Sequence, residues 1–313
     1  MTARSYRVVH RTDYVYDDDV GASYGRAHLL PRDQPDQRCL SATVVVQPEP
    51  RDVHEHTDYF GNRSSYFGVF QQHRQLTVTA TSVVETDRTP VTWQELDDAP
   101  ATLPGIDDPG NALDAAAYRL PSPMVPPLPA VAEYAAASFP PGRPLGQALA
   151  DLLGRIHADF TYASGATTVT TTLTELLAQR RGVCQDFAHL ALGCLRSVGL
   201  PARYVSGYLE TTPPPGRPRL QGVDASHAWV SLLVPGLGWT DLDPTNNQPV
   251  DGRYVVVARG RDYSDVPPLK GVIFTNSKTS TLRVAVDVAP LDTLPEAPAP
   301  PATATVPIPL EEE

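Results

Sequence analysis

The first 87 residues carry the pattern of β-strands, because apolar and polar positions alternate in short runs rich in β-branched and aromatic residues. Turn residues such as those in Asp58–Asn62 separate the runs, and no helical periodicity of useful length interrupts them. We predict strands over residues 6–10, 12–16, 41–46, 65–70 and 76–84. A small antiparallel β-sandwich over residues 1–87 accounts for this pattern.

From residue 88 to residue 129 the chain is irregular and rich in proline, which indicates a linker with a short helix around residues 112–118. An apolar stripe at helical spacing follows. It consists of Leu145, Leu149, Leu152, Leu153 and Ile156. We predict helices over residues 131–139, 145–156, 172–180 and 184–198.

The remainder of the chain reads as strands, which we predict over residues 202–209, 227–234, 238–243, 254–257 and 282–288. Pro213–Gly216 cannot continue a strand and is predicted to be a surface loop. Helices followed by strands place the chain in the α+β class, with one core over residues 130–289. Residues 290–313 are rich in alanine and proline, so we predict a disordered tail.

The chain has 313 residues, enough for two domains, and its formal net charge of −11 argues against nucleic acid and anionic membranes as partners. Its first residues lack the apolar core of a signal peptide, and no apolar run reaches the ~20 residues that a membrane span needs. The three cysteines form no CxxC pair and no cluster with zinc spacing, so we expect no metal or other cofactor. These features favour a cytoplasmic protein with reduced thiols.

Cys184 carries the strongest chemical signal in the chain. It follows Gly182 and begins an apolar helical run, so its thiol is predicted to lie at a helix N-terminus. The helix dipole stabilises a thiolate there by up to ~2 kcal/mol, or about one pKa unit below the usual ~8.5. Most of the thiol would still be protonated at neutral pH, so a nucleophilic cysteine needs a histidine partner.

Two histidines compete for that role. His189, five positions after Cys184, lies about 140° around a helix from it and cannot face the same point. His227 begins a strand and reaches the thiol only through tertiary folding. A carboxylate must orient the imidazole, and Asp241 and Asp243 share one face of the next strand, so the pattern does not separate them. The position of Asp243 at the strand end, before a proline, favours it.

The other two cysteines have no such setting. Cys194 lies on an apolar face in the middle of a predicted helix, and Cys39 lies on an early strand. Both are interpreted as small hydrophobic residues.

Three segments together resemble the transglutaminase-like superfamily of papain-like thiol enzymes. They are GVCQDFA at residues 182–188, HAW at residues 227–229 and WTDLDPT at residues 239–245. The resemblance implies a papain-like core of helices packed on an antiparallel sheet. It also implies Cys184 as nucleophile, His227 as base and Asp243, rather than Asp241, as the carboxylate that orients the base.

The same resemblance implies the surroundings of the site. Tyr162, Gln185 and Trp229 are expected near the oxyanion position or in the lining, and the backbone N–H of Cys184 is expected to be one oxyanion donor. The N-terminal region resembles the β domain that precedes this core in many bacterial members. Gln37 and residues 58–63 are among its marks.

The implied activity is acyl transfer on a peptide or carboxamide bond through a thioester. Water as acceptor gives a peptidase or amidase, which we favour because bacterial members of the family are often peptidase-like. An amine as acceptor gives a protein-glutamine gamma-glutamyltransferase, and a non-catalytic scaffold or peptide-binding module is a third alternative. We expect a peptide or protein substrate, with an amine co-substrate in the second case, and the oligomeric state stays open.

Overall fold

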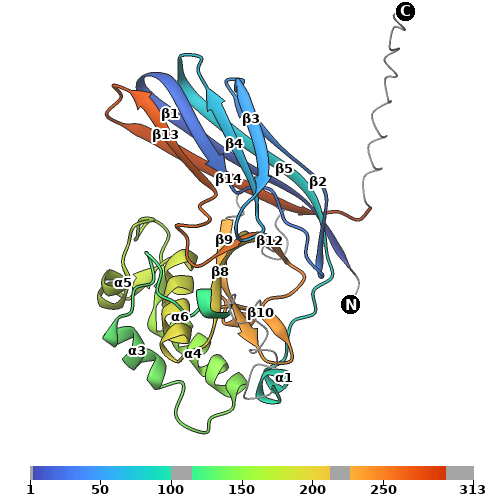
Figure 1. Ribbon diagram of the computed structural model, residues 1–313, viewed down its shortest axis with the longest axis vertical. Helices are drawn as coiled ribbons and strands as arrows, with labels where there is room; N and C mark the ends of the chain where they lie inside the picture. Colours follow the sequence, from blue (N-terminus) through green and yellow to red (C-terminus); the bar gives the residue numbers. More distant parts are fainter. Residues whose placement is uncertain (1–2, 100–114, 212–225, 294–313) are drawn as a thin grey trace, which may run out of the picture.

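The computed structural model describes residues 3–99, 115–211 and 226–293, which form an N-terminal β domain and an α+β core (Figure 1). The β domain is a seven-stranded sheet in the order β2-β5-β1-β4-β3, with β13 and β14 also paired to β1. The strands are β1 Arg4–Ala27, β2 Gln37–Gln47, β3 Asp52–Thr57, β4 Arg63–Val69, β5 His73–Thr86, β13 Leu269–Thr275 and β14 Ser280–Pro290. The predicted α+β class is confirmed.

β1 is a strand of 24 residues with different neighbours along its two halves. Its first half pairs with β5 and β14, and its second half pairs with β4 and β13. Side chains from several strands, among them Val20, Val46, Phe67 and Val78, pack into one hydrophobic cluster. The two halves therefore enclose a shared core, as the predicted sandwich requires.

The last two strands belong to this N-terminal sheet and not to the core, where we expected every residue up to 289. β13 pairs with the second half of β1, and β14 pairs with residues 6–16 of its first half. The alternation over residues 282–288 predicts a strand but not its partner, because pairing depends on register with a distant segment. Val286 and Val288 are buried in the main core cluster, which gives this register its stability.

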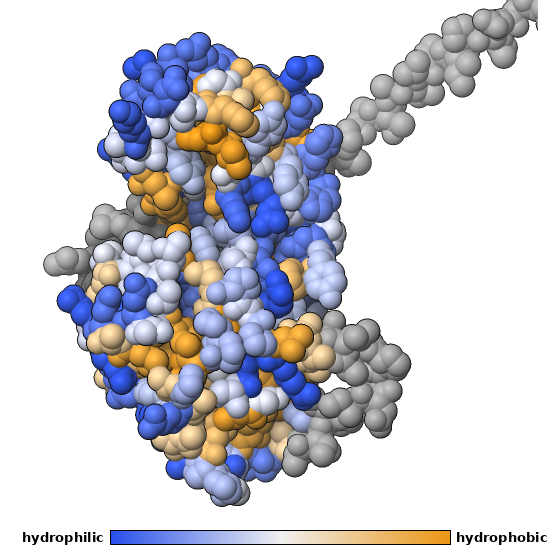
Figure 2. Space-filling model, turned by 60° about the vertical axis from the view of Figure 1, so that its left-hand side comes forward, coloured by the Kyte–Doolittle hydropathy of each residue, from blue (hydrophilic) through white to orange (hydrophobic). Residues whose placement is uncertain are grey.

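Apolar side chains also interrupt the hydrophilic surface of the molecule (Figure 2). On the β domain, Phe70 and Phe274 are exposed, and Tyr24 packs edge-on against both rings. The contact between Tyr24 and Phe274 helps to attach β13 to β1.

Five helices described in the structure are α1 Trp93–Asp97, α3 Pro129–Ala136, α4 Leu145–Asp159, α5 Leu173–Gln179 and α6 Cys184–Ser197. The last four confirm the predicted helices, with ends that differ by a few residues. α1 lies in the expected linker and begins with a capping box, in which Thr92 and Glu95 bond each other's backbone N–H. Residues 115–117 are helical, and residues 112–114 of the short predicted helix lie outside the described residues.

The core sheet is antiparallel, with the strand order β11-β10-β9-β8-β12. Its strands are β8 Ala202–Leu209, β9 Ser226–Val234, β10 Gly238–Asp243, β11 Gln248–Pro249 and β12 Tyr254–Gly260. One face packs on α6, with Tyr204 and Val230 in the main core cluster. Val205, Trp229 and Tyr254 form a separate cluster on the other face. The predicted arrangement of helices on an antiparallel sheet is confirmed.

β12 is an edge strand of the core sheet, and two side-chain amides of the β domain cover it. Gln37 donates to the carbonyl of Val256 and accepts from its N–H, each at 2.7 Å. Asn62 makes the same two bonds with Arg259, each at 2.8 Å. These amides satisfy backbone groups that a further strand would otherwise bind, and they attach the β domain to the core.

Two predicted features cannot be compared with the structure. The loop at Pro213–Gly216 and the tail from residue 294 onward lie outside the described residues. Pro290, the first residue of the expected tail, is the last residue of β14 and pairs with Tyr6. Within the described part of the chain, each helix is too short or too polar to cross a lipid bilayer.

Candidate active site

Cys184 is the first residue of α6, and local contacts hold the start of this helix in place. Asp186, in the first turn, accepts the N–H of Val183 at 2.8 Å and the hydroxyl of Thr167 at 2.7 Å. A Cβ atom on Gly182 would lie 2.8 Å from the Asp186 carboxylate, so a side chain at this turn would displace it. The Cys184 side chain is half-buried at the N-terminus of this helix.

Tyr162 lies beside this helix start. A two-residue parallel pair joins β6 (Thr161–Tyr162) to β7 (Arg181–Gly182), and the N–H of Ala163 donates to the carbonyl of Gly182 at 2.9 Å. Partial burial and the nearby Cys184 raise the pKa of the Tyr162 hydroxyl, although the residue is 53% exposed. The phenol therefore stays protonated at neutral pH and can donate a hydrogen bond close to the sulfur.

His227, near the start of β9, pairs with Asp243 and lies near Cys184. Its Nε2 lies 2.7 Å from Oδ2 of Asp243. Burial acts to lower the pKa of His227, but the charge and hydrogen bond of Asp243, together with the neighbouring Cys184 thiol, raise this pKa to about 10. Since Nε2 faces the carboxylate, Nδ1 is the ring nitrogen that remains for the sulfur.

Asp243, the last residue of β10, is fully buried and heavily hydrogen bonded. Besides His227, Oδ2 accepts from the hydroxyl of Tyr254 at 2.7 Å and the side-chain amide of Asn246 at 2.6 Å, and Oδ1 accepts the N–H of Thr245 at 2.8 Å. Burial acts to raise the pKa of Asp243, but the charge of His227 and these bonds hold it below its usual value. The carboxylate is therefore ionised at neutral pH and fixed in orientation.

Asp241 lies on the same face of β10 but meets different groups. Its Oδ2 accepts from Nε1 of Trp229 at 3.2 Å and lies 3.9 Å from the guanidinium of Arg259. The Trp229 side chain is fully buried, and its ring centroid is 6.1 Å from that of His227. The structure thus brings Asp243, and not Asp241, to the imidazole.

Two family models match the chain. The bacterial transglutaminase-like N-terminal region matches residues 6–85, and the transglutaminase-like superfamily matches residues 136–244. An uncharacterised protein of Mycobacterium tuberculosis is 48% identical over 301 residues, which cover 92% of this chain and 93% of that protein. The chain belongs to the transglutaminase-like superfamily.

More distant relatives extend the comparison of this transglutaminase-like chain. A protein-glutamine gamma-glutamyltransferase of Pseudomonas aeruginosa is 34% identical over 127 residues, 33% of this chain and 18% of that protein. A solved structure from Cytophaga hutchinsonii, of a protein proposed to be a cysteine protease, has a TM-score of 0.75 and 23% identity. It covers 94% of this chain and 92% of its own, so the two proteins share a fold over nearly their whole length.

The other residues expected at the transglutaminase-like site take supporting positions. Gln185 is buried, and its amide donates to the carbonyl of Val169 at 3.2 Å, which attaches the loop before α5 to the helix start. Trp229 packs beside the imidazole. His189, which we excluded, is buried and accepts the N–H of Tyr263 at 3.2 Å, and burial lowers its pKa to about 4.

Sequence reasoning missed two side chains that bind Asp243. Asn246 follows it in the segment DPTNN, where an aspartate before proline and asparagine is a recognisable turn signal. Tyr254 begins β12 and carries no local signal, because its contact with Asp243 depends on how the strands come together. Among the described residues, no group of three or more His, Cys, Asp or Glu side chains could hold a metal ion.

Proposed function

We propose that this protein is a cysteine-dependent acyl-transfer enzyme that cleaves peptide or carboxamide bonds through a thioester. Cys184 is the nucleophile, His227 the general base and acid, and Asp243 the carboxylate that orients the imidazole. The observation that carries the proposal is the bond between His227 and the buried carboxylate of Asp243, with the thiol at the start of α6 close enough to raise the pKa of the imidazole. A helix N-terminus and a nearby imidazole bound to a buried carboxylate are the setting in which cysteine nucleophiles act.

In the first step, the thiolate of Cys184 attacks the substrate carbonyl carbon and a C–S bond forms. His227 then gives its proton to the leaving nitrogen as the C–N bond breaks, which leaves a thioester and a free amine. The developing oxyanion needs donors, and the backbone N–H of Cys184 has no acceptor within its own helix because it lies in the first turn. We assign the Tyr162 hydroxyl as a second donor.

In the second step, His227 takes a proton from the acceptor as the acceptor attacks the thioester and the sulfur leaves. Water as acceptor releases a free acid. We favour water, and the fold shared with the Cytophaga protein proposed to be a cysteine protease supports this choice. An amine acceptor is the second candidate, because the Pseudomonas relative that matches part of this chain is a protein-glutamine gamma-glutamyltransferase.

A peptide library incubated with and without a primary amine tests the two acceptors. Hydrolysis gives free acid in both samples, whereas amine transfer gives a conjugate only when amine is present. Cys184→Ala should remove every product, since the sulfur forms the intermediate. Products that persist in Cys184→Ala would contradict the proposed nucleophile.

Thiol reactivity separates an enzyme from a scaffold that only binds peptides. Iodoacetamide at neutral pH should label Cys184 at least tenfold faster than Cys39 or Cys194. Burial raises the pKa of the Cys39 thiol and raises that of Cys194 to about 12, so both serve as internal controls. Labelling is followed by mass spectrometry of the three peptides, and equal rates would favour the scaffold.

We further propose that the protein works in the cytoplasm on a peptide or protein substrate. All three cysteines are free, and the nucleophile must remain a reduced thiol. Cell fractionation with an antibody against the protein tests the location, and recovery outside the cytoplasm would contradict it.

A further inference from the structure

A cavity that the proposed function does not use lies on the sheet face opposite α6. It has a volume of about 590 Å³ and is enclosed by residues 34–36, by residues 88–91 after β5, and by parts of β8, β10 and β12. Arg88, Arg203 and Arg259 all line it, and we call it the arginine cavity. Its size falls within the range of small-molecule sites, roughly 300–1,000 Å³.

Arg88 is the most informative side chain of the arginine cavity. It is only 8% exposed, and its Nε donates to the carboxylate of Asp36. Both of its Nη atoms are buried and have no hydrogen-bond partner among the described residues. Unpaired buried guanidinium groups are costly, and a planar guanidinium matches a carboxylate or phosphate with two parallel bonds.

The two other arginines add positive charge to the same cavity. Arg203 is also 8% exposed, and its guanidinium stacks 3.9 Å from the centroid of the Trp239 ring. The Nε atoms of Arg203 and Arg259 lack hydrogen-bond partners within the described part of the chain. Burial, and then the charge of Arg259, lower the pKa of Arg203, which reflects the crowding of like charges.

The formal charges around the cavity balance, but the hydrogen bonds do not. Three carboxylates, those of Asp36, Asp241 and Glu95, line it together with the three arginines. Asp36 meets Arg88 at Nε, and the Glu95 carboxylate is bound by Thr92 at the start of α1. An anion in the cavity would supply acceptors for the two Nη atoms of Arg88, which have none among the described residues.

We propose that the arginine cavity binds a small organic anion. Its carboxylate or phosphate group would be held by Arg88 and Arg203. Its apolar body would pack against Val91, Leu237 and Val250, which line the same cavity. The proposal does not depend on the proposed function, because neither Arg88 nor Arg203 contacts Cys184 or His227 in the contacts recorded for them.

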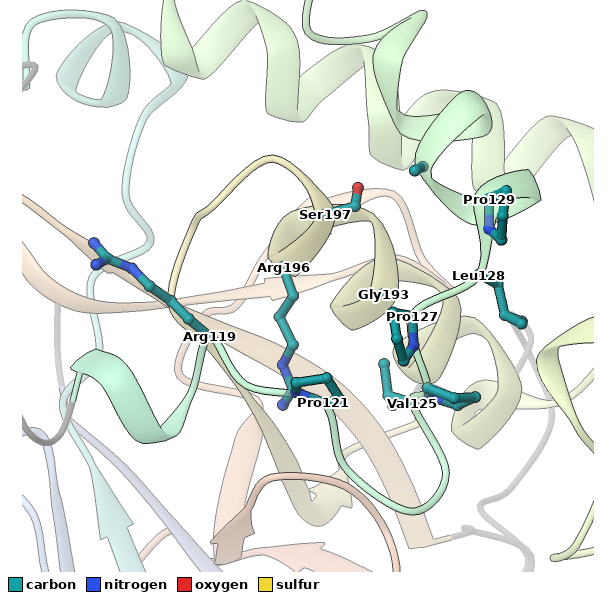
Figure 3. A pocket seen from close by; sticks show the side chains of 11 residues that line it. Arg119, Pro121, Val125, Pro127, Leu128, Pro129, Gly193, Arg196 and Ser197 are labelled. Carbon is teal, nitrogen blue, oxygen red and sulfur yellow. The ribbon is translucent and has the colours of Figure 1, made fainter.

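A second cavity shows what distinguishes the arginine cavity. It has a volume of about 320 Å³ and lies between residues 119–129 and the C-terminal half of α6, where Arg196 and Ser197 border it (Figure 3). Arg196 donates to the carbonyls of Tyr118, Ala202 and Arg261 and to the hydroxyl of Ser122. The Arg196 guanidinium is thus already paired with protein acceptors. Arg119 also lines this cavity, and of its side-chain nitrogens only Nε is buried without a partner among the described residues, whereas both Nη atoms of Arg88 are.

Isothermal titration calorimetry of the full chain tests the proposal with two probes, inorganic phosphate and phenylacetate, at constant ionic strength. We expect one of them to bind with a stoichiometry of one and a dissociation constant in the millimolar range or below. Arg88→Met should weaken that binding at least tenfold, since it replaces the apolar stem of the arginine and removes the guanidinium. Tighter binding of phosphate would identify a phosphate ligand, and tighter binding of phenylacetate a carboxylate.

Two further variants keep the test decisive. Arg38→Met removes an exposed arginine paired with Glu85 on the β domain, and it should leave binding unchanged. Leu237→Trp enlarges a residue at the rim that is 42% exposed, so it should block the cavity without affecting folding, even if Arg88→Met does not fold. The proposal is overturned if neither probe binds the unmodified protein, or if Leu237→Trp binds the probe as tightly as the unmodified protein does.

Discussion

Asp241 and Asp243 stand two residues apart on the same face of β10, yet their surroundings differ in kind. Asp243 accepts hydrogen bonds from His227, from two neutral side chains and from the backbone, and it meets no arginine in the recorded contacts. Asp241 accepts from Trp229 and lies among the charges of Arg88, Arg203 and Arg259.

β10 thus contributes a carboxylate to two different environments on one face of the core sheet, which we call the Asp243 end and the Asp241 end. At the Asp243 end, neutral donors fix a carboxylate whose negative charge acts on a single imidazole, which is what the proposed catalytic role of His227 needs. At the Asp241 end, three guanidinium groups gather, and several of their buried N–H groups remain without acceptors among the described residues. Trp229 lies between the ends, bonded to Asp241 and packed beside His227.

The largest expected effect comes from exchanging each aspartate for asparagine. Asp243→Asn removes the charge that orients and stabilises the imidazolium, so kcat/KM on a cleaved peptide should fall by ~10³–10⁴. Asp241→Asn should change it by less than about tenfold, because Asp241 does not reach His227. Circular dichroism of both variants controls for folding. Equal losses in two folded variants would remove the distinction between the aspartates.

The sequence already indicated much of this site, for reasons that are local. The glycine before Cys184, the helical stripe after it and the strand patterns around His227 and Asp243 are all properties of short segments. β8 and β10 begin and end at the predicted residues, 202–209 and 238–243.

What could not be predicted depends on contacts between distant segments. Strand alternation does not predict that β14 pairs with β1. It also does not predict the hydrogen bond from Tyr254 to Asp243 or the bonds between Gln37 and β12. The arginine cavity is of the same kind, since Arg88 and Arg203 are 115 positions apart and each alone resembles an ordinary surface arginine. α1 is different, because the capping-box pattern of Thr92 and Glu95 is local, and the sequence alone is enough to predict this helix start.

The dependence of stability on pH gives the next largest effect. His227 has a folded pKa of about 10, above the ~6.5 of an unfolded chain. Its contribution is therefore complete below pH 6.5 and is lost as the pH rises toward 10, by up to ~1.4 kcal/mol per pH unit. Urea unfolding of the unmodified protein at a series of pH values should show this loss, because the Cys184 thiol is one of the groups that raise the His227 pKa. His227→Gln should lack the loss, and parallel curves for the two proteins would show that His227 does not carry the effect.

A smaller effect, on the free energy of unfolding, is expected from crowding Trp229, which lies between Asp241 and His227. Gly207 lies beneath this ring, and a Cβ atom there would lie 2.5 Å from Cη2 of Trp229 and 2.1 Å from the carbonyl oxygen of Val255. Gly207→Ala should lower the free energy of unfolding by ~2–3 kcal/mol. Gly154→Ala in α4 is the matched control, since its Cβ would meet only Asn247, at 3.9 Å, and should stabilise the helix by up to ~1 kcal/mol. Urea denaturation measures both, and an unchanged Gly207→Ala midpoint would mean that Trp229 is not held tightly.

The smallest expected effect comes from removing one hydrogen bond to Asp243. Tyr254→Phe keeps the ring that packs against Trp229 and removes the hydroxyl that donates to Asp243, so it should cost ~1.5 kcal/mol, the lower end for a bond to a charged group. The pKa of Asp243 should rise, because one of the bonds that lower it is lost.

A double-mutant cycle measures the coupling energy between the Tyr254 hydroxyl and each of the two aspartates. In Asp243→Asn the bond no longer meets a charge, so Tyr254→Phe should cost ~1 kcal/mol less there than in the unmodified protein. In Asp241→Asn its cost should stay unchanged, since Tyr254 donates only to the neighbouring carboxylate. Equal coupling to both aspartates would mean that the two ends of the sheet face share one electrostatic network, and that an anion in the arginine cavity would act directly on His227.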